Sequence, residues 1–231
     1  MSSIYRYIPF FTLFDILKNS HLTFVRPALW EDPFEGFLFR KHKTTVGQQQ
    51  IREYVLRFQN QQYYSLLELT LNNFERMFFA QSWSKSNESD AIWNTYGYEN
   101  SGIRIEMDQE YFTNIDFITR LEAEYVQKLS LEDDLIRVGI KEGKTDLKKL
   151  YKFKREAFSY EKEIRFIYED RNQVNERVGE TKDVSIDTKE IKSVLVHPKA
   201  KEYYVDIVRQ LCTLYEVPFI GKSKLYTFEI E

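Results

Sequence analysis

The sequence predicts an α+β fold: one domain over residues 1–231, with mixed or antiparallel sheets of short strands and helical insertions. Short stretches of alternating apolar and polar residues recur along the chain, as is typical of strands. Amphipathic helical stretches lie between them, without the regular alternation of a parallel α/β protein. Neither an internal repeat nor a linker rich in Gly, Ser or Pro divides the chain.

The first half of the chain alternates strands with amphipathic helices. The long helical stretch carries two apolar stripes, and the glutamines between them mark a break or a phase shift. Pro27 and Pro33 enforce an irregular loop. We expect strands at Ile4–Ile8, Leu22–Val25, Phe79–Ser84 and Ile103–Met107, and helices at Thr12–Asn19, from Gln48 to about Phe78, and around Ile92–Tyr96 after a cap at Ser86 or Ser89.

The second half of the chain also combines predicted strands and helices. Two charged helices are followed by short strands, a polar loop and one amphipathic helix near the end. We expect strands at Phe117–Val126, Ile164–Tyr168, Ile191–Val196, Val217–Ile220 and Leu225–Ile230, helices at Leu131–Ile140, Asp146–Phe158 and Ala200–Tyr215, and the loop at Arg171–Asp183.

Composition excludes several classes of protein. Lys and Arg total 33 against 36 Asp and Glu, a net charge of −3, which argues against a polybasic binder but leaves room for a local basic groove. Cys212 is the only cysteine, so a reducing cytoplasm is expected. His21, His42 and His197 are far apart, so we expect no metal site. No signal peptide or membrane-crossing stretch is expected.

The sharpest candidate site lies around Glu161. If a strand begins there, Glu161, Glu163 and Arg165 share one face while Ile164 and Phe166 face the core. Two carboxylates beside an arginine could form an acid/base or transition-state-stabilising pair. On pattern alone, a solvated sheet face is the commoner interpretation.

Further candidates lie elsewhere in the chain. Ser82 and Ser84 share a strand face and could orient a polar ligand. Trp93 or Tyr96 could stack on a flat ring, although core packing is the commoner explanation for such an aromatic pair. Arg6, between Tyr5 and Tyr7, could bind an anion or lie at an exposed edge. Asp32–Glu35 is a rigid turn with two acids. The chain has no P-loop, G-x-G-x-x-G, H-E-x-x-H or G-x-S-x-G motif.

Several segments occur in an order that resembles one family over nearly the whole chain. They are Tyr5–Tyr7, Leu22–Phe24 with Pro27, Trp30–Glu35, Ile92–Tyr96, Gly102–Ile105, Tyr160–Arg165 and Val194–Ala200. Together they resemble a large bacterial family of unknown function, similar to the AbiGi-type abortive-infection and phage-defence proteins. That resemblance implies a role in defence but no activity.

A weaker resemblance implies an activity. ADP-ribosyltransferases of the Arg–Ser–Glu type have an arginine on the first strand, Ser-x-Ser on a middle strand and Glu-x-Glu before a late strand. Arg6, Ser82–Ser84 and Glu161–Glu163 match in type and order, although Trp83 stands where the family usually has threonine and long helical insertions separate the parts. The resemblance implies an ADP-ribosyltransferase-like fold and NAD as co-substrate.

The same resemblance implies roles for these residues. Glu163 stabilises the positive charge that develops on the ribose, and Glu161 positions or deprotonates the acceptor. Arg6 holds the pyrophosphate, Ser82 and Ser84 complete the donor site, and a ring among Tyr7, Trp93 and Tyr96 packs on the nicotinamide. No metal is required, and Arg6, Ser82 and Glu163 must converge on one cleft.

Three functions remain open on the sequence. The first is an NAD-dependent, toxin-like effector that modifies a protein or nucleic-acid acceptor and has an antitoxin or chaperone partner. The second is a non-catalytic partner-binding module of a toxin–antitoxin or phage-defence system. The third is a nuclease or other hydrolase using Asp32, Glu35, Glu161 and Glu163 around a divalent ion, although acids so far apart carry no spacing signature.

Overall fold

The computed structural model describes residues 2–30, 32, 34–170 and 181–227. Over these residues the main sheet has nine strands in the order β11-β10-β4-β1-β3-β2-β9, with β8 beside β3 and β5 beside β8. All pairs in it are antiparallel except β10 with β11. Its strands are β1 (Ser3–Ile8), β2 (His21–Val25), β3 (Phe78–Ser84), β4 (Ile103–Asp108), β5 (Ile118–Glu122), β8 (Glu163–Glu169), β9 (Thr181–Ser185), β10 (Ser193–Val196) and β11 (Phe219–Lys222).

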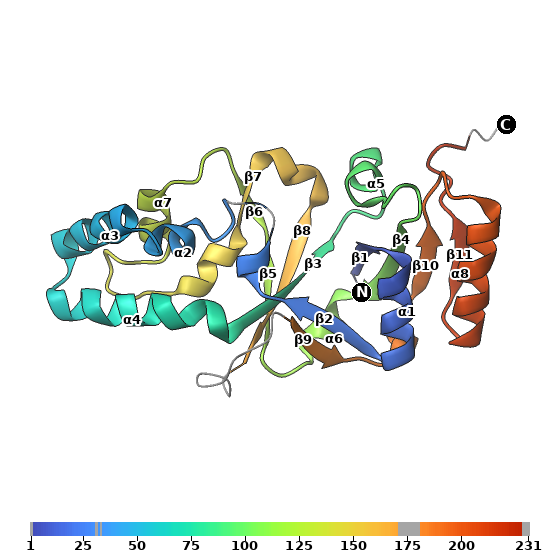
Figure 1. Cartoon of the computed structure of the whole chain (residues 1–231), viewed down its shortest axis with the longest axis horizontal. Helices are drawn as coiled ribbons and strands as arrows, with labels where there is room; N and C mark the ends of the chain where they lie inside the picture. Colours follow the sequence, from blue (N-terminus) through green and yellow to red (C-terminus); the bar gives the residue numbers. More distant parts are fainter. Residues whose placement is uncertain (1, 31, 33, 171–180, 228–231) are drawn as a thin grey trace.

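Helices cover both ends of this sheet, and β6 and β7 form a small parallel pair (Figure 1). The α-helices are α1 (Phe10–Asn19), α2 (Phe37–His42), α3 (Thr45–Phe58), α4 (Gln61–Met77), α5 (Asp90–Tyr96), α6 (Gln109–Thr113), α7 (Leu131–Arg137) and α8 (Glu202–Leu214). The short elements are η1 (Pro27–Leu29), η2 (Leu147–Lys152), η3 (Glu156–Glu161), η4 (Thr188–Glu190), β6 (Glu124–Val126) and β7 (Phe153–Arg155). The expectation of a mixed fold with a mostly antiparallel sheet and several helices is confirmed.

Two apolar cores lie on opposite faces of β3 and β8. Phe79 and Trp83 of β3 belong to the core that α1, α6 and α8 cover. Phe78 and Ala80, which alternate with them, belong to the core beneath α2, α3, α4, α7 and η2. β3 therefore joins the two packed halves of the molecule, and both of its faces are buried.

Local signals in the sequence mark several boundaries correctly. The long helical stretch breaks after Phe58, and the Asn60 side chain caps α4 by accepting a hydrogen bond from the Tyr63 amide at 2.9 Å. Ser89, one of the two serines proposed as a cap, accepts from the Ile92 amide at 3.2 Å and begins α5. Over the described part of the chain, no helix has both the length and the apolar character needed to cross a membrane.

Two expected elements are wrong. The helix over Asp146–Phe158 is replaced by η2, β7 and η3, because Phe153–Arg155 extends to pair with β6. The strand over Phe117–Val126 divides into β5 and β6. β5 pairs antiparallel with β8, which begins at Glu163. The hydrogen bond from the Ala123 amide to the Glu163 carbonyl lies at that end of β8, so the chain after Ala123 has no further β8 residue with which to pair.

Two other expectations fall partly outside the described residues. Of the polar loop over Arg171–Asp183, only 181–183 is described, and it belongs to β9 rather than to a loop. Of the strand over Leu225–Ile230, only 225–227 is described, and it is a turn rather than a strand.

Candidate active site

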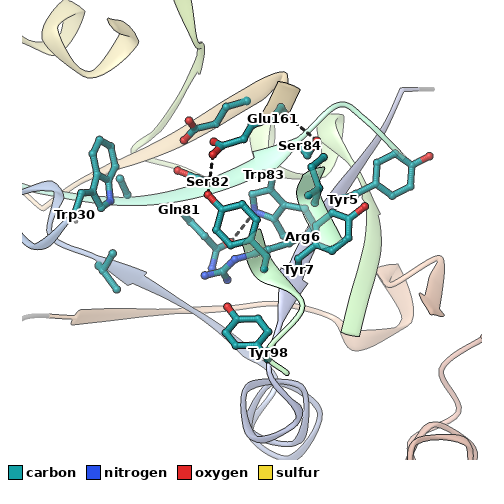
Figure 2. Close-up of a pocket in the computed structure, with 15 residues that line it drawn as sticks. Tyr5, Arg6, Tyr7, Trp30, Gln81, Ser82, Trp83, Ser84, Tyr98 and Glu161 are labelled. Atoms are coloured by element: carbon teal, nitrogen blue, oxygen red, sulfur yellow. Dashed lines mark hydrogen bonds between the residues drawn. The ribbon is translucent and has the colours of Figure 1, made fainter. Parts of the chain in front are cut away.

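The candidate site opens where two strands separate beside β3 (Figure 2). On one side, β3 pairs with β8 along its whole length. On the other side, β3 pairs with β1 at Ser84 and with β2 at Ala80, while β1 continues along β4 and β2 along β9. Between Ala80 and Ser84, no strand in the described structure pairs with this second edge of β3. The gap holds a pocket of about 260 Å³, which we call the inner pocket.

Arg6 of β1 lines the inner pocket, and no residue that the structure describes is its counter-ion (Figure 2). Desolvation lowers the pKa of its half-buried guanidinium to about 10, so it stays charged at neutral pH. Within the described residues, Arg6 makes no hydrogen bond or ion pair. A desolvated, unpaired cation is unfavourable in the free protein, and a guanidinium fits phosphate well. Arg6 is therefore equipped to bind an anion in this pocket.

The two serines of β3 have different surroundings. Both line the inner pocket. The Ser84 hydroxyl donates to the Glu161 carbonyl at 2.6 Å and accepts from the Ser86 amide at 2.9 Å, so it holds the end of η3 against β3. The half-buried Ser82 hydroxyl has no partner among the described residues. Ser82 can therefore bind a ligand, whereas Ser84 shapes the backbone.

Three carboxylates surround one ammonium group beside the pocket. Lys154 Nζ lies 2.8 Å from Glu163 Oε2 and 3.5 Å from Glu35 Oε1, and it also bonds to Glu161. Arg165 donates from Nε to Glu163 Oε1 at 2.8 Å and from Nη2 to Glu35 Oε1 at 2.7 Å. β7, β8, η3 and the segment before α2 each supply part of this carboxylate cluster, which is an extended network of charge-assisted hydrogen bonds.

This geometry corrects the expected strand face. β8 begins at Glu163 rather than Glu161, because Lys162 adopts a left-handed backbone with φ 45° and ends η3. Glu163 is 4 % exposed and Arg165 is completely buried, so the interpretation as a solvated face is wrong. Glu161 still reaches the cluster, from the end of η3.

Burial and ion pairing fix the charges in the cluster. Burial alone would raise the pKa of Glu163, but Arg165 and Lys154 outweigh it and lower that pKa to about 2. Burial would lower the pKa of Lys154, and the three carboxylates raise it instead. For Glu35, burial dominates over the two cations and the pKa is raised. Glu163 is therefore an ionised carboxylate at neutral pH.

The aromatic residues expected to hold a flat ring are placed unequally. Tyr96 lines the inner pocket and its hydroxyl donates to Glu161 Oε1 at 2.9 Å. Tyr7 also lines the pocket, and its ring meets Trp93 edge-on at 4.7 Å between centroids. Trp93 is 1 % exposed, bonds to Glu88 and lies outside the pocket lining. The expectation that Trp93 packs on a ligand ring is not supported by its position, which is that of a core residue.

A larger pocket of about 620 Å³ adjoins the first, and we call it the outer pocket. The two share a wall made of Trp30, Ser82, Tyr96, Tyr98, Glu161 and Glu163. Leu29, Asp32, Glu35, Thr95, Lys154, Arg155 and Phe158 complete the outer pocket. Arg6, Ser82 and Glu163 thus lie on one continuous cleft.

The four acids considered as metal ligands also meet in the outer pocket. Lys154 and Arg165 lie among three of them, and Arg155 pairs with Asp32 at 3.0 Å. No group of three or more His, Cys, Asp or Glu residues in the described structure is arranged to hold a metal ion. Fixed ammonium and guanidinium groups thus neutralise most of the negative charge.

Sequence reasoning missed Lys154, Arg155 and Tyr98 as site residues. The two cations fell in a stretch interpreted as a charged helix, where such residues are expected in solvent. Tyr98 begins a turn in which residues 98–100 all have left-handed backbones, with φ 46°, 54° and 69°. Consecutive left-handed residues other than glycine store strain, which often marks a ligand site. No spacing pattern in the sequence predicts this turn.

Comparisons with known proteins give few matches. No family model matches the chain, and no curated protein matches it; the resemblance to AbiGi-type proteins gains no family match. Among solved structures, the chain is similar to that of DarT from Thermus sp. 2.9 in complex with ADP-ribosylated ssDNA. The TM-score is 0.39 at 10 % identity, covering 94 % of this chain and 92 % of that one.

Proposed function

We propose that this chain is an NAD-dependent ADP-ribosyltransferase-like effector of bacterial antiviral defence, which transfers ADP-ribose to an acceptor. One observation carries the proposal. Arg6, a cation with no partner in the described part of the chain, and Glu163, an ionised carboxylate, line the same cleft at the point where β1 leaves β3. A donor that contains a diphosphate and develops positive charge on a sugar requires both kinds of group.

Arg6 and Ser82 bind the donor in this proposal. The guanidinium binds the diphosphate through charge-assisted hydrogen bonds, which relieves its own lack of a counter-ion. The Ser82 hydroxyl, which has no partner among the described residues, bonds to the donor's sugar or amide. Tyr7 and Tyr96 give the pocket aromatic walls.

The carboxylate cluster performs the chemistry. Breaking the bond between ribose and nicotinamide leaves positive charge on the sugar, and a nearby ionised carboxylate stabilises it. Glu163 has a fixed charge and a fixed orientation, since both of its oxygens are held by Arg165 and Lys154. Three carboxylates against two cations leave the cluster negative. Glu161, whose two oxygens accept from Tyr96 and Lys154, accepts the acceptor's proton in this proposal.

The defence role and the partners follow from the family resemblance alone. A toxin-like effector acts in the cytoplasm, where NAD is available, and is expected to have an antitoxin or chaperone that restrains it. This part of the proposal is an analogy between families.

The first test compares the wild type with Glu163→Gln on labelled NAD in cell lysate. We expect the variant to release nicotinamide and transfer label at least about 100-fold more slowly, because it loses the charge that faces the ribose. Glu163→Gln also removes a partner of buried cations, so circular dichroism and a melting curve must show that the variant folds.

Arg6→Gln is a cleaner variant, because no described residue depends on Arg6. We expect the Kd for NAD to rise about 10- to 100-fold, while the free energy of unfolding does not fall. Arg209→Gln on α8, whose side chain is 55 % exposed, is the matched control. NAD left intact by the wild type, with a stoichiometric partner recovered by pull-down, would favour the partner-binding module instead.

A further inference from the structure

The segment that follows β11 is hydrogen-bonded to the start of α5. Ser223 is buried, and its hydroxyl donates to the Glu88 carboxylate, 135 positions earlier in the chain. The Tyr226 hydroxyl donates to Asp90 in the first turn of α5. We call residues 223–226 the α5 strap, because two of its side chains hold the beginning of that helix.

Glu88 joins the α5 strap to the interior of the protein. Its Oε1 atom accepts from the Ser223 hydroxyl and also from the indole Nε1 of Trp93, the latter at 2.9 Å. Trp93 is almost completely buried, so its N–H group needs a partner inside the protein. The strap therefore holds Glu88 in the position that orients the Trp93 ring.

Trp93 in turn supports a wall of the inner pocket. Its ring meets the Tyr7 ring edge-on, with 86° between the planes, and Tyr7 lines the pocket. The Tyr7 hydroxyl donates to the Asn87 carbonyl at 2.5 Å, so the residue before Glu88 holds the far end of the same side chain. The ring and the hydroxyl of Tyr7 are thus both held by the segment that Glu88 anchors.

The Glu88 carboxylate acts here as a hydrogen-bond acceptor and not as a counter-ion. Two neutral groups donate to it, and no cation among the described residues pairs with it. The nearby His197 ring packs edge-on against Trp93, at 5.1 Å between centroids. Burial lowers the pKa of His197, and its Nδ1 accepts from the Lys199 amide, so this ring is neutral at pH 7. What Glu88 contributes is therefore the geometry of its contacts.

We propose that Glu88, Trp93 and the α5 strap are positioning residues, which hold Tyr7 at the wall of the inner pocket, so that loosening the strap weakens donor binding. The proposal rests on the proposed function, in which Arg6, the neighbour of Tyr7 on β1, binds the diphosphate. Both oxygens of Glu163 are held from β7 and β8, outside this chain of contacts. The step that breaks the bond to nicotinamide should therefore be retained once the donor is bound.

The first experiment measures nicotinamide release from NAD by Ser223→Ala. We expect the KM for NAD to rise about 5- to 10-fold, because one hydrogen bond that holds Glu88 is lost, while kcat changes less than about twofold. Ser65→Ala on α4 is the matched control, since the exposed Ser65 hydroxyl donates within its own helix to the Gln61 carbonyl at 3.1 Å.

The outcomes separate the two proposals. A Ser223→Ala protein that melts at a lower temperature but keeps the wild-type KM would show a merely structural role and would overturn the inference. Failure of the wild type to bind NAD or to release nicotinamide would overturn the proposed function.

A pair of Glu88 variants tests whether position or charge matters. Glu88→Gln keeps an oxygen that can accept from both Trp93 and Ser223, so we expect its KM for NAD to stay within about threefold of the wild type. Glu88→Ala removes the acceptor, and we expect its KM to rise about 10-fold or more. Equal effects of the two substitutions would contradict a positioning role.

Amide hydrogen exchange tests the strap without NAD. We expect Ser223→Ala to speed exchange in α5 about 10-fold, because a lost hydrogen bond lowers the free energy of local opening, and to leave α7 unchanged. Exchange in α5 at the wild-type rate would overturn the inference whether or not the protein uses NAD.

Discussion

Two arginines, on the strands β1 and β8 that flank β3, show the contrast between structural and functional charge. Arg165 is completely buried and bonds to Glu163, to Glu35 and to the Tyr151 carbonyl, so its charge is fully used inside the protein. Arg6 is half-buried and has no partner in the described chain. Retaining an unpaired cation opposes folding, and such features persist where function requires them.

Lys154 holds the cluster together, and Lys154→Met tests this at the residue scale. The change leaves three buried carboxylates without their shared ammonium. We expect the free energy of unfolding to fall by about 3–5 kcal/mol at pH 7. The loss should be smaller at pH 5, because carboxylates that lose their cation have raised pKa values and take up protons. Urea titrations at the two pH values measure both.

The control for Lys154→Met is Lys152→Met in the adjacent turn. The Lys152 side chain is 38 % exposed and lies 3.8 Å from Glu124, so its loss should change the free energy of unfolding by less than about 1 kcal/mol. Equal losses for Lys154→Met at pH 5 and pH 7 would show that lost packing, and not charge, explains the effect.

At the scale of elements, the segment η2–β7–η3 supplies Lys154 and Glu161 to the site. The sequence predicted a helix over most of this segment. The pairing of β7 with β6 turns Lys154 inward, where it meets the carboxylates. η3 then places Glu161 beside Tyr96 of α5. Helix propensity is a weak prior, and tertiary pairing overrides it here.

A second inter-element contact, from α7 to α2, depends on pH. Asp134 of α7 is 2 % exposed and accepts a hydrogen bond from the Leu38 amide at 3.2 Å. Burial raises the pKa of Asp134 from 3.8 to about 6, although Arg137 opposes the shift. A raised folded-state pKa means that the carboxyl's contribution to stability is complete below about pH 3.8 and is lost as the pH rises through about 6.

Asp134→Asn should therefore stabilise the protein at neutral pH. The amide keeps an acceptor for the Leu38 amide and carries no charge to desolvate. We expect a gain of about 1–3 kcal/mol at pH 7 that shrinks toward zero near pH 4. Asp206→Asn on the exposed face of α8 is the control, and urea titrations across this range measure both variants. A gain of the same size at pH 4 and pH 7 would rule out titration as its cause.

At the scale of the whole molecule, the cleft lies at the junction of the two cores. β3 and β8 bury one face in each core, and Glu161 of η3 and Glu163 of β8 line the pocket that opens where β1 and β2 part beside β3. Residues as far apart in the sequence as Arg6 and Glu163 meet there. A ligand that binds this junction stabilises both halves of the molecule together.

Binding of NAD should therefore raise global stability by mass action. At an NAD concentration of 100 times the Kd, we expect the free energy of unfolding to rise by about 2.7 kcal/mol. At the same concentration the 10- to 100-fold weaker binding of Arg6→Gln should reduce the rise to about 0.4–1.4 kcal/mol, and the full rise should persist for Arg209→Gln. Urea titrations with and without NAD give these values. An undiminished rise for Arg6→Gln would show that NAD binds away from the inner pocket.

The sequence by itself determined the elements whose signals are local. The strands over Ile4–Ile8 and Leu22–Val25, a break or phase shift at the glutamines of the long helical stretch, and a cap at Ser86 or Ser89 follow from periodicity and capping, which depend on neighbours a few residues apart. It also indicated Arg6, Ser82 and Glu163 as a set, through a resemblance and not through spacing.

Only the tertiary structure decided what covers each face. Alternation showed that Glu163 and Arg165 share a side of β8, but not that this side is buried. The bond from Arg165 to Glu35 spans 130 positions, so no local pattern contains it. No local pattern contains the ion pairs of Lys154 either, because the predicted helix implied that this side chain is exposed to solvent. Ion pairs between distant segments form only when the fold excludes water from both partners, and that is a property of the whole chain.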